Sequence, residues 1–236
     1  MRLGDWASIG VLLFLALPLS ALPLSRPDQS VSSAGLNAIV LLGHSHIAHW
    51  DVKSLGGFPT INRGHSGDRT TDLLARFERD VVPVHPRAVL VWAFDNDVMD
   101  ADRRNIALAT HQAETNLLKL AEMAEAHSIQ PILTTEVTIR GDGFFDQIAN
   151  VLMPLFGKTP YQDRVNRRII EGNKWVREQA GRRHLLLIDV QRALADSSEQ
   201  RRPEFATADG VHLTSQAYAV ITAQADAILR ARLGPE

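Results

Sequence analysis

The sequence predicts an α/β fold, a three-layer α/β/α sandwich built on a five-stranded parallel sheet of the flavodoxin-like type. Short apolar runs alternate along the chain with longer amphipathic stretches, which indicates repeated strand–helix units. The apolar runs are bounded by polar or turn residues, as is typical of strands buried in a parallel sheet. With 236 residues, 45% of them hydrophobic, the chain is long enough to form one sizeable core.

Five apolar runs are expected to form the strands of this sheet. They are Ala38–Leu42, Pro59–Asn62, Ala88–Ala93, Pro131–Thr135 and His184–Ile188. Amphipathic stretches predict helices at Thr70–Val81, Arg104–Ala126, Gln162–Ala180 and Ser215–Leu233. One irregular insertion, residues 136–160, is predicted to be a loop. Ligands in such sheets bind at the carboxyl ends of the strands, so functional residues are expected directly after each strand.

The first residues predict export from the cytoplasm. Arg2 precedes an uncharged, mostly apolar run at residues 9–24, and small residues follow its most apolar part, which resembles a secretory signal peptide. Pro18 and Pro23 interrupt the run, which is shorter than the ~20 residues of a usual membrane-spanning helix. We therefore expect a signal peptide or uncleaved N-terminal anchor at residues 1–25, a linker at 26–35 and one folded domain at 36–236, in the periplasm or outside the cell.

Composition excludes several classes of function. The formal charge is -2, because 25 basic residues are balanced by 27 acidic ones, so no basic surface for nucleic acid is expected. The chain has no cysteine, which rules out thiol catalysis, disulfide bonds and thiolate metal sites.

The segment after the first predicted strand is Gly43-His44-Ser45-His46-Ile47. A serine on a turn between a strand and a helix has its hydroxyl exposed at the rim of the sheet, which nucleophilic catalysis requires. The Gly-x-Ser-x-Gly elbow of α/β-hydrolases is disfavoured, because Ile47 stands where that turn needs its second glycine.

The same segment offers a metal-binding alternative. His44, His46 and His49 form His-x-His-x-x-His, a spacing that resembles the metallo-β-lactamase type of hydrolase. Such sites have an aspartate just before the third histidine, and this chain has Ala48 there. A His-rich metallohydrolase is therefore the less favoured interpretation.

Three further segments follow later strands or precede the last helix. Gly64 and Gly67 lie three residues apart in front of a predicted helix, where backbone N–H groups can approach a negatively charged ligand. Asn96 follows the third strand and could donate a hydrogen bond to a developing oxyanion. Asp209 and His212 are three residues apart, so the carboxylate can orient the imidazole if the intervening backbone bends.

Together these segments resemble the sequence blocks of the SGNH, or GDSL-like, hydrolases in order and separation. The family's Gly-Asp-Ser block is matched by Gly43-His44-Ser45, and its Asn-x-Gly-x-x-Gly block by Asn62–Thr71. Its Gly-x-Asn-Asp block is matched by Phe94–Asp97 and its Asp-x-x-His block by Asp209–His212. The resemblance covers about residues 36–232 and departs from the family at His44, which replaces an aspartate, and at Phe94, which replaces a glycine.

The resemblance implies a serine esterase with Ser45 as nucleophile, His212 as general base and acid, and Asp209 as its orienting partner. It implies an oxyanion hole of the Ser45 and Gly67 backbone N–H groups and the Asn96 amide, with no metal ion or organic cofactor. The expected substrates are acyl or acetyl esters of lipids or carbohydrates, as small molecules or polysaccharides. A non-catalytic carbohydrate-binding or cell-envelope module on the same fold is the alternative, since a fold hosts many functions.

Overall fold

The computed structural model describes residues 37–141, 152–153 and 159–234. Among these residues, six strands form one sheet in the order β2-β3-β1-β4-β5-β6. The strands are β1 (Ile39–Gly43), β2 (Ser54–Leu55), β3 (Phe58–Gly64), β4 (Ala88–Trp92), β5 (Gln130–Thr134) and β6 (Leu186–Ile188). The expected signal peptide and linker, and most of the predicted insertion, lie outside the described residues.

The five predicted strands are confirmed, and all of them are parallel. In chain order of the parallel strands, their arrangement β3-β1-β4-β5-β6 is the flavodoxin-like 2-1-3-4-5. The expected count of five was one short, because β2 pairs antiparallel with the start of β3. This hairpin turns through Gly56 and Gly57, both at positive φ, and its two-residue strand is too short to show a period in the sequence.

The four long predicted helices are also confirmed, within a few residues at their ends. They are α2 (Thr70–Asp80), α4 (Ile106–Ala126), α6 (Tyr161–Arg183) and α8 (Ser215–Leu233). Short helical segments that periodicity did not predict follow individual strands or join elements. They are α1 (Ser45–Ala48), α3 (Asp95–Met99), α7 (Val190–Leu194), and the 3-10 turns η1 (Val82–Val84) and η2 (Pro203–Phe205).

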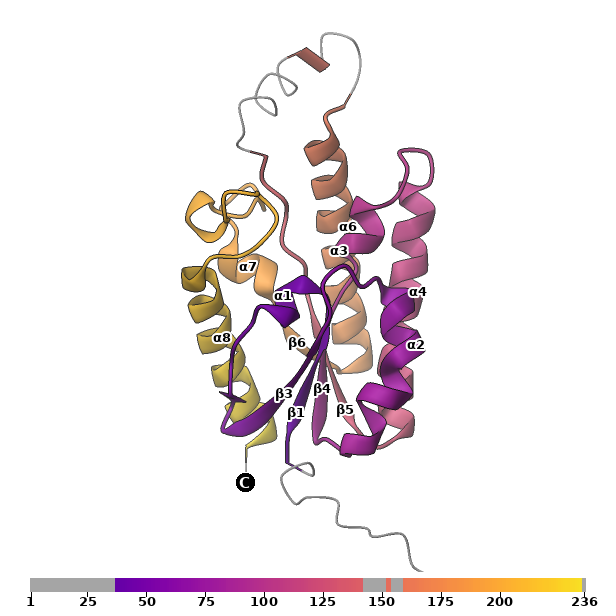
Figure 1. Ribbon diagram of the computed structural model, residues 1–236, viewed down its shortest axis with the longest axis vertical. Helices are drawn as coiled ribbons and strands as arrows, with labels where there is room; N and C mark the ends of the chain where they lie inside the picture. Colours follow the sequence, from indigo (N-terminus) through magenta and orange to yellow (C-terminus); the bar gives the residue numbers. More distant parts are fainter. Residues whose placement is uncertain (1–36, 142–151, 154–158, 235–236) are drawn as a thin grey trace, which may run out of the picture. The chain divides into compact units, whose positions relative to one another are not determined.

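Two hydrophobic cores cover the two faces of the sheet, as the three-layer fold requires. Strand β1 is buried throughout, and its side chains alternate between the cores. Val40 and Leu42 pack on the face covered by α2, α4 and α6, whereas Ile39 and Leu41 pack on the face covered by α1, α7 and α8 (Figure 1). Because these strands are parallel, their carboxyl ends lie at one edge of the sheet, where α1 and α3 begin.

The backbone of α1 lies directly against the end of β3. Gly43 pairs with Gly64 at the last position of the β1–β3 register, and the His65 N–H donates to the Gly43 carbonyl at 2.9 Å. A Cβ at residue 64 would stand 2.2 Å from the backbone nitrogen of Ala48. Only glycine fits this contact, which places Ser45 beside the loop that follows β3.

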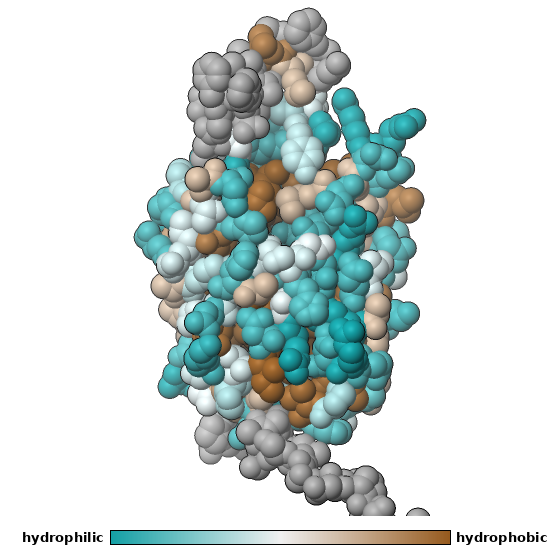
Figure 2. Space-filling model, in the orientation of Figure 1, coloured by the Kyte–Doolittle hydropathy of each residue, from teal (hydrophilic) through white to brown (hydrophobic). Residues whose placement is uncertain are grey.

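The face of the molecule in Figure 2 is mainly hydrophilic. Within the described residues, the exposed large hydrophobic side chains are Leu108, Leu152, Met153 and Tyr161. No helix in this part of the chain combines the length and the apolar character that a membrane span needs.

Replacing Gly64 with alanine should destabilise the fold by about 3 kcal/mol, because the new methyl group would overlap backbone atoms that cannot move aside. The control is Gly181→Ala in α6, where a Cβ has open space and alanine favours the helix by up to ~1 kcal/mol. Urea unfolding of both variants checks this; equal midpoints would contradict the contact.

Candidate active site

Ser45 is the first residue of α1, immediately after β1 and its cap residue His44. The His44 backbone is extended, and its Nδ1 accepts a 3.3 Å hydrogen bond from the His46 backbone N–H. The Tyr218 hydroxyl of α8 donates to the His46 carbonyl at 2.9 Å, which fixes the turn from the other side. These hydrogen bonds hold the turn that begins at Ser45 from two sides. Ser45 itself is 8% exposed.

Asp209 and His212 form a hydrogen-bonded pair, as predicted. Asp209 Oδ2 lies 2.6 Å from His212 Nδ1, and its Oδ1 accepts from the Thr207 hydroxyl and from the backbone N–H groups of Val211 and His212. Desolvation would raise the pKa of Asp209, but these hydrogen bonds outweigh it and hold that pKa well below its usual range. The loop bends at Gly210, which has φ +71°.

The Asp209–His212 pair lies against the α1 turn. The His212 ring centroid is 5.1 Å from that of His49 and 6.3 Å from that of His46. No hydrogen bond joins the Ser45 hydroxyl to the His212 ring in the described part of the chain. The structure thus brings Asp209 and His212 into contact and places them beside the turn of Ser45.

The predicted oxyanion-hole residues Gly67 and Asn96 come from the loop before α2 and from α3, which contact each other. Gly67 has φ +85°, and Asn96 Nδ2 donates to the carbonyl of Asp68, the next residue, at 2.9 Å. Asp97 strengthens the contact, because its carboxylate accepts the backbone N–H and the hydroxyl of Thr70 at the start of α2. The structure therefore joins the second and third sequence blocks, as expected.

Arg76 links the same loop to β1. It is 5% exposed and donates to Asp68 Oδ2 at 2.7 Å, Asp80 Oδ2 at 2.9 Å and the Gly43 carbonyl at 3.1 Å. This buried guanidinium holds the Gly67 loop next to the residue that precedes His44 and Ser45. Sequence reasoning did not single out Arg76, because its contact with the Gly43 carbonyl joins residues that are distant in the chain.

Phe94 occupies a backbone conformation that favours glycine, with φ 129° and ψ -9°. Its ring is buried and packs on α6, where a Cβ at Gly172 would lie 2.9 Å from Phe94 Cε2. The family's glycine at this position is thus replaced by an aromatic residue that keeps the glycine-type backbone, and its bulk points away from the Asn96 loop into the core.

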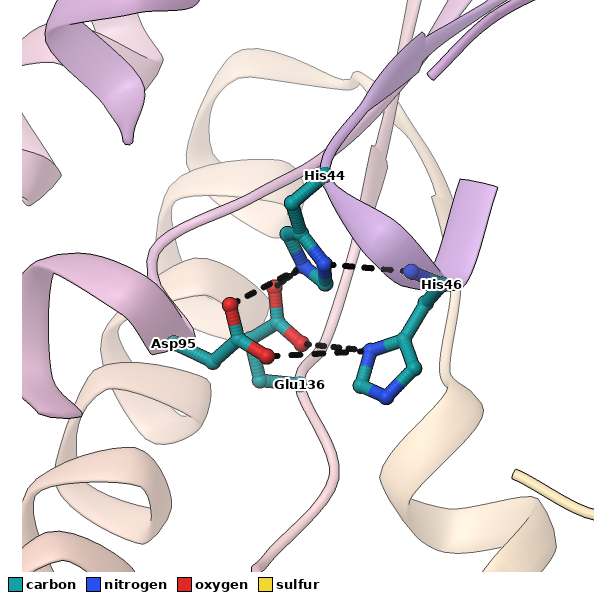
Figure 3. A group of neighbouring side chains, drawn as sticks. All are labelled: His44, His46, Asp95 and Glu136. Carbon is teal, nitrogen blue, oxygen red and sulfur yellow. Dashed lines mark hydrogen bonds and ion pairs between the residues drawn. The ribbon is translucent and has the colours of Figure 1, made fainter. Parts of the chain in front are cut away.

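Four buried side chains, His44, His46, Asp95 and Glu136, meet next to Ser45 (Figure 3). His44 Nε2 lies 2.9 Å from Glu136 Oε1 and 3.2 Å from Asp95 Oδ1. Desolvation lowers the pKa of His44, but the carboxylates of Asp95 and Glu136 overcome it and raise that pKa to about 9. Desolvation and the neighbouring His44 lower the pKa of His46 to about 3, and burial raises the pKa of Asp95.

This cluster differs from the histidine triplet considered in the sequence. His44 and His46 do lie together, but their described neighbours are carboxylates, whereas His49 is exposed and its ring meets that of His212 edge to face. Sequence reasoning missed Asp95 and Glu136 as partners. Their position was the available signal, because they follow the neighbouring strands β4 and β5, which end at the same sheet edge as β1.

A family comparison decides the classification. Residues 43–220 match the model of the GDSL-like Lipase/Acylhydrolase family, which is more than half of the chain. The chain belongs to this family. It is a GDSL-like hydrolase, and the resemblance drawn from its sequence blocks is confirmed. No curated protein matches its sequence.

Solved structures share the fold of this GDSL-like hydrolase. A GDSL-like lipase from Bacteroides thetaiotaomicron is 22% identical, with a TM-score of 0.65 over 83% of this chain and 89% of its own. A catalytic mutant of an acetylxylan esterase from Geobacillus stearothermophilus, with serine changed to alanine, is 19% identical, with a TM-score of 0.60 over 82% and 93%.

Phe94 offers a test of the backbone at the third block. Alanine normally stabilises a position relative to glycine, but at φ 129° the order should reverse. We expect Phe94→Gly to be more stable than Phe94→Ala by about 1 kcal/mol, with both below the parent chain because the buried ring is lost. Chemical unfolding of the two variants measures this, and a more stable alanine variant would contradict the backbone conformation.

Proposed function

We propose that this GDSL-like hydrolase cleaves a carboxylic ester through an acyl-enzyme on Ser45. The observation that carries the proposal is the Asp209–His212 pair, joined at 2.6 Å and lying beside the turn on which Ser45 is the first residue. Ser-His-Asp constellations of this kind recur on unrelated folds, and they are recognised by the roles of their side chains.

The Asp209 contact sets the proton chemistry of His212. Because a carboxylate accepts the proton on Nδ1, Nε2 of the neutral ring is left as a base. His212 Nε2 then takes the Ser45 hydroxyl proton as the oxygen attacks the ester carbonyl, and returns it to the departing alcohol. Water then attacks the acyl-enzyme with the same two proton transfers by His212, which releases the acid and regenerates Ser45. The missing Ser45–His212 hydrogen bond fits the free enzyme, since such bonds often tighten only with substrate bound.

Three donors could stabilise the oxyanion of the tetrahedral intermediate. The backbone N–H groups of Ser45 and Gly67 have no acceptor among the described residues. Asn96 uses one amide hydrogen on the Asp68 carbonyl and keeps the second for substrate. Fixed donors of this kind lower the barrier without reorganisation during the reaction.

The proposed substrate is an acyl or acetyl ester of a lipid or carbohydrate, met outside the cytoplasm. Similar structures include a lipase and an acetylxylan esterase, which supports both classes. The sequence of residues 1–25 supports export, with a signal peptide or N-terminal anchor. A series of p-nitrophenyl esters of increasing chain length, run beside acetylated xylan, would distinguish lipid from carbohydrate esters.

Ser45→Ala should abolish hydrolysis of p-nitrophenyl acetate, because no other group on α1 can form the acyl-enzyme. A fluorophosphonate probe should label the parent chain and not this variant. Ser54→Ala is the matched control, an exposed serine on β2 whose loss should change neither result. Full turnover by Ser45→Ala would refute the mechanism, and saturable sugar binding without turnover in the parent would support a non-catalytic module.

Asp209→Asn should lower kcat by roughly 10²–10⁴-fold, because the amide no longer holds the required imidazole tautomer. Asp196→Asn is the control, since this exposed aspartate accepts similar local hydrogen bonds from Ser198 and Gln200. Steady-state kinetics of both variants give the comparison. Equal kcat values would show that Asp209 does not orient the base.

A further inference from the structure

The buried cluster next to Ser45 holds two carboxylates and two imidazoles that no step of the proposed reaction uses. Its members follow three adjacent strands: His44 and His46 follow β1, Asp95 follows β4 and Glu136 follows β5. Each is at most 3% exposed. In Figure 3 the two carboxylates lie side by side and face both rings. Two carboxylates with so little access to water need positive charge beside them, and the raised pKa of His44 supplies one unit of it.

His46 has an unused lone pair in this cluster. Its Nε2 lies 3.3 Å from the Val211 carbonyl, which can only accept a hydrogen bond, so Nε2 carries the proton. The neutral ring then has an unprotonated Nδ1, and this buried atom has no hydrogen-bond partner among the described residues. It faces Asp95 Oδ2 at 3.7 Å and Glu136 Oε2 at 3.9 Å, which are acceptors as well. These three atoms form a set of acceptors that a cation can bind.

His44 plays a different part from His46. In the neutral ring its Nδ1 accepts from the His46 backbone N–H, and in either charge state its Nε2 carries a proton toward Glu136 Oε1 and Asp95 Oδ1. These bonds leave Asp95 Oδ2 and Glu136 Oε2 turned toward His46. The Trp92 indole N–H also donates to Glu136 Oε2 at 2.9 Å. His44 and Trp92 thus orient the carboxylates as outer-shell groups orient the ligands of a metal site.

We propose that His46 Nδ1, Asp95 Oδ2 and Glu136 Oε2 bind a divalent transition-metal ion such as Zn²⁺. The hydrogen bond from His46 Nε2–H to a backbone carbonyl is the usual outer-shell contact of a metal-bound histidine. A dication balances the two carboxylates in place of the proton that His44 carries when no ion is bound. A mixed imidazole and carboxylate set favours zinc, iron or manganese over calcium or magnesium, which prefer oxygen ligands alone.

The size of the cluster fits such an ion. One ligand atom from each of the four residues lies within 4.8 Å of the others. Zinc bonds of ~2.0–2.2 Å in a tetrahedral arrangement separate neighbouring ligand atoms by about 3.4 Å. His46 Nδ1 lies 3.7 Å from Asp95 Oδ2 and 3.9 Å from Glu136 Oε2. Shifts of a few tenths of an ångström would shorten both distances to the value for zinc ligands.

The ion would connect the two turns that carry the proposed catalytic groups. His46 directly follows Ser45, and Asp95 directly precedes Asn96. A metal ion bound to both would fix the serine turn relative to the amide donor, without contacting substrate. The site is a positioning element, and its existence does not depend on the proposed esterase activity.

The test uses the full chain as Ser45→Ala, so that its outcome is independent of catalysis. Protein treated with EDTA is dialysed to equilibrium against Zn²⁺, and bound zinc and the thermal midpoint are measured. We expect one zinc per chain and a raised midpoint. His46→Gln should weaken binding at least ~100-fold, because changes even in the outer shell typically cost 10–100-fold. Asp95→Asn is the second ligand variant, and circular dichroism verifies that both fold.

His49→Gln is the matched control, a neighbouring histidine of the same turn that is exposed and lies outside the cluster. It should keep the zinc and the raised midpoint. Zinc lost in His49→Gln and kept in His46→Gln would place the ion at the surface with His212 and overturn the proposal. An absence of stoichiometric binding by the parent chain would overturn it too. Substituted Co²⁺ should show visible absorption in the parent that His46→Gln lacks.

Discussion

The contact between Gly64 and the backbone of α1 is the constraint on which the rest of the site depends. Parallel pairing of β1 with β3 ends at Gly43 and Gly64, and the missing side chain at residue 64 lets α1 rest directly on the end of β3. Ser45 and both histidines of the buried cluster are carried by this turn or its cap. Arg76 and Tyr218 then attach the turn and its strand to the helices on the two faces of the sheet.

The site combines two environments that adjoin in space, since His46 Nε2 lies 3.3 Å from the carbonyl of Val211, the residue before His212. The Asp209–His212 pair is partly open to solvent, as a proton-transferring pair that must meet a substrate has to be. The cluster of His44, His46, Asp95 and Glu136 is closed to solvent, and its interactions are internal to the protein. Ser45 lies between His44 and His46 in the chain, and both of these histidines are directed into the cluster (Figure 3), whereas His212 is outside it. The short α1 turn therefore separates the face that can meet an ester from a charged interior.

The sequence was sufficient for the fold and for the contact between Asp209 and His212. The five parallel strands are short apolar runs and the four long helices are amphipathic stretches, and Asp209 and His212 are close enough in the chain for their contact to be foreseen. β2 is too short to have a period. Asp95 and Glu136 belong together only through the neighbouring ends of β1, β4 and β5, so their contact with His44 requires the strand order. The backbone conformation of Phe94 could not be predicted from the sequence for another reason, because aromatic residues rarely adopt a positive φ.

Phe94 also makes two distant positions interdependent. Its ring fills the space in which a side chain at Gly172 of α6 would otherwise stand. A return to glycine at residue 94 would leave a void that only a larger residue at 172 could fill, whereas a larger residue at 172 alone would collide with the ring. Each single step is unfavourable, so the loop beside the oxyanion donor and the middle of α6 can change only together. This coupling confines the third sequence block to its unusual form for as long as α6 keeps its glycine.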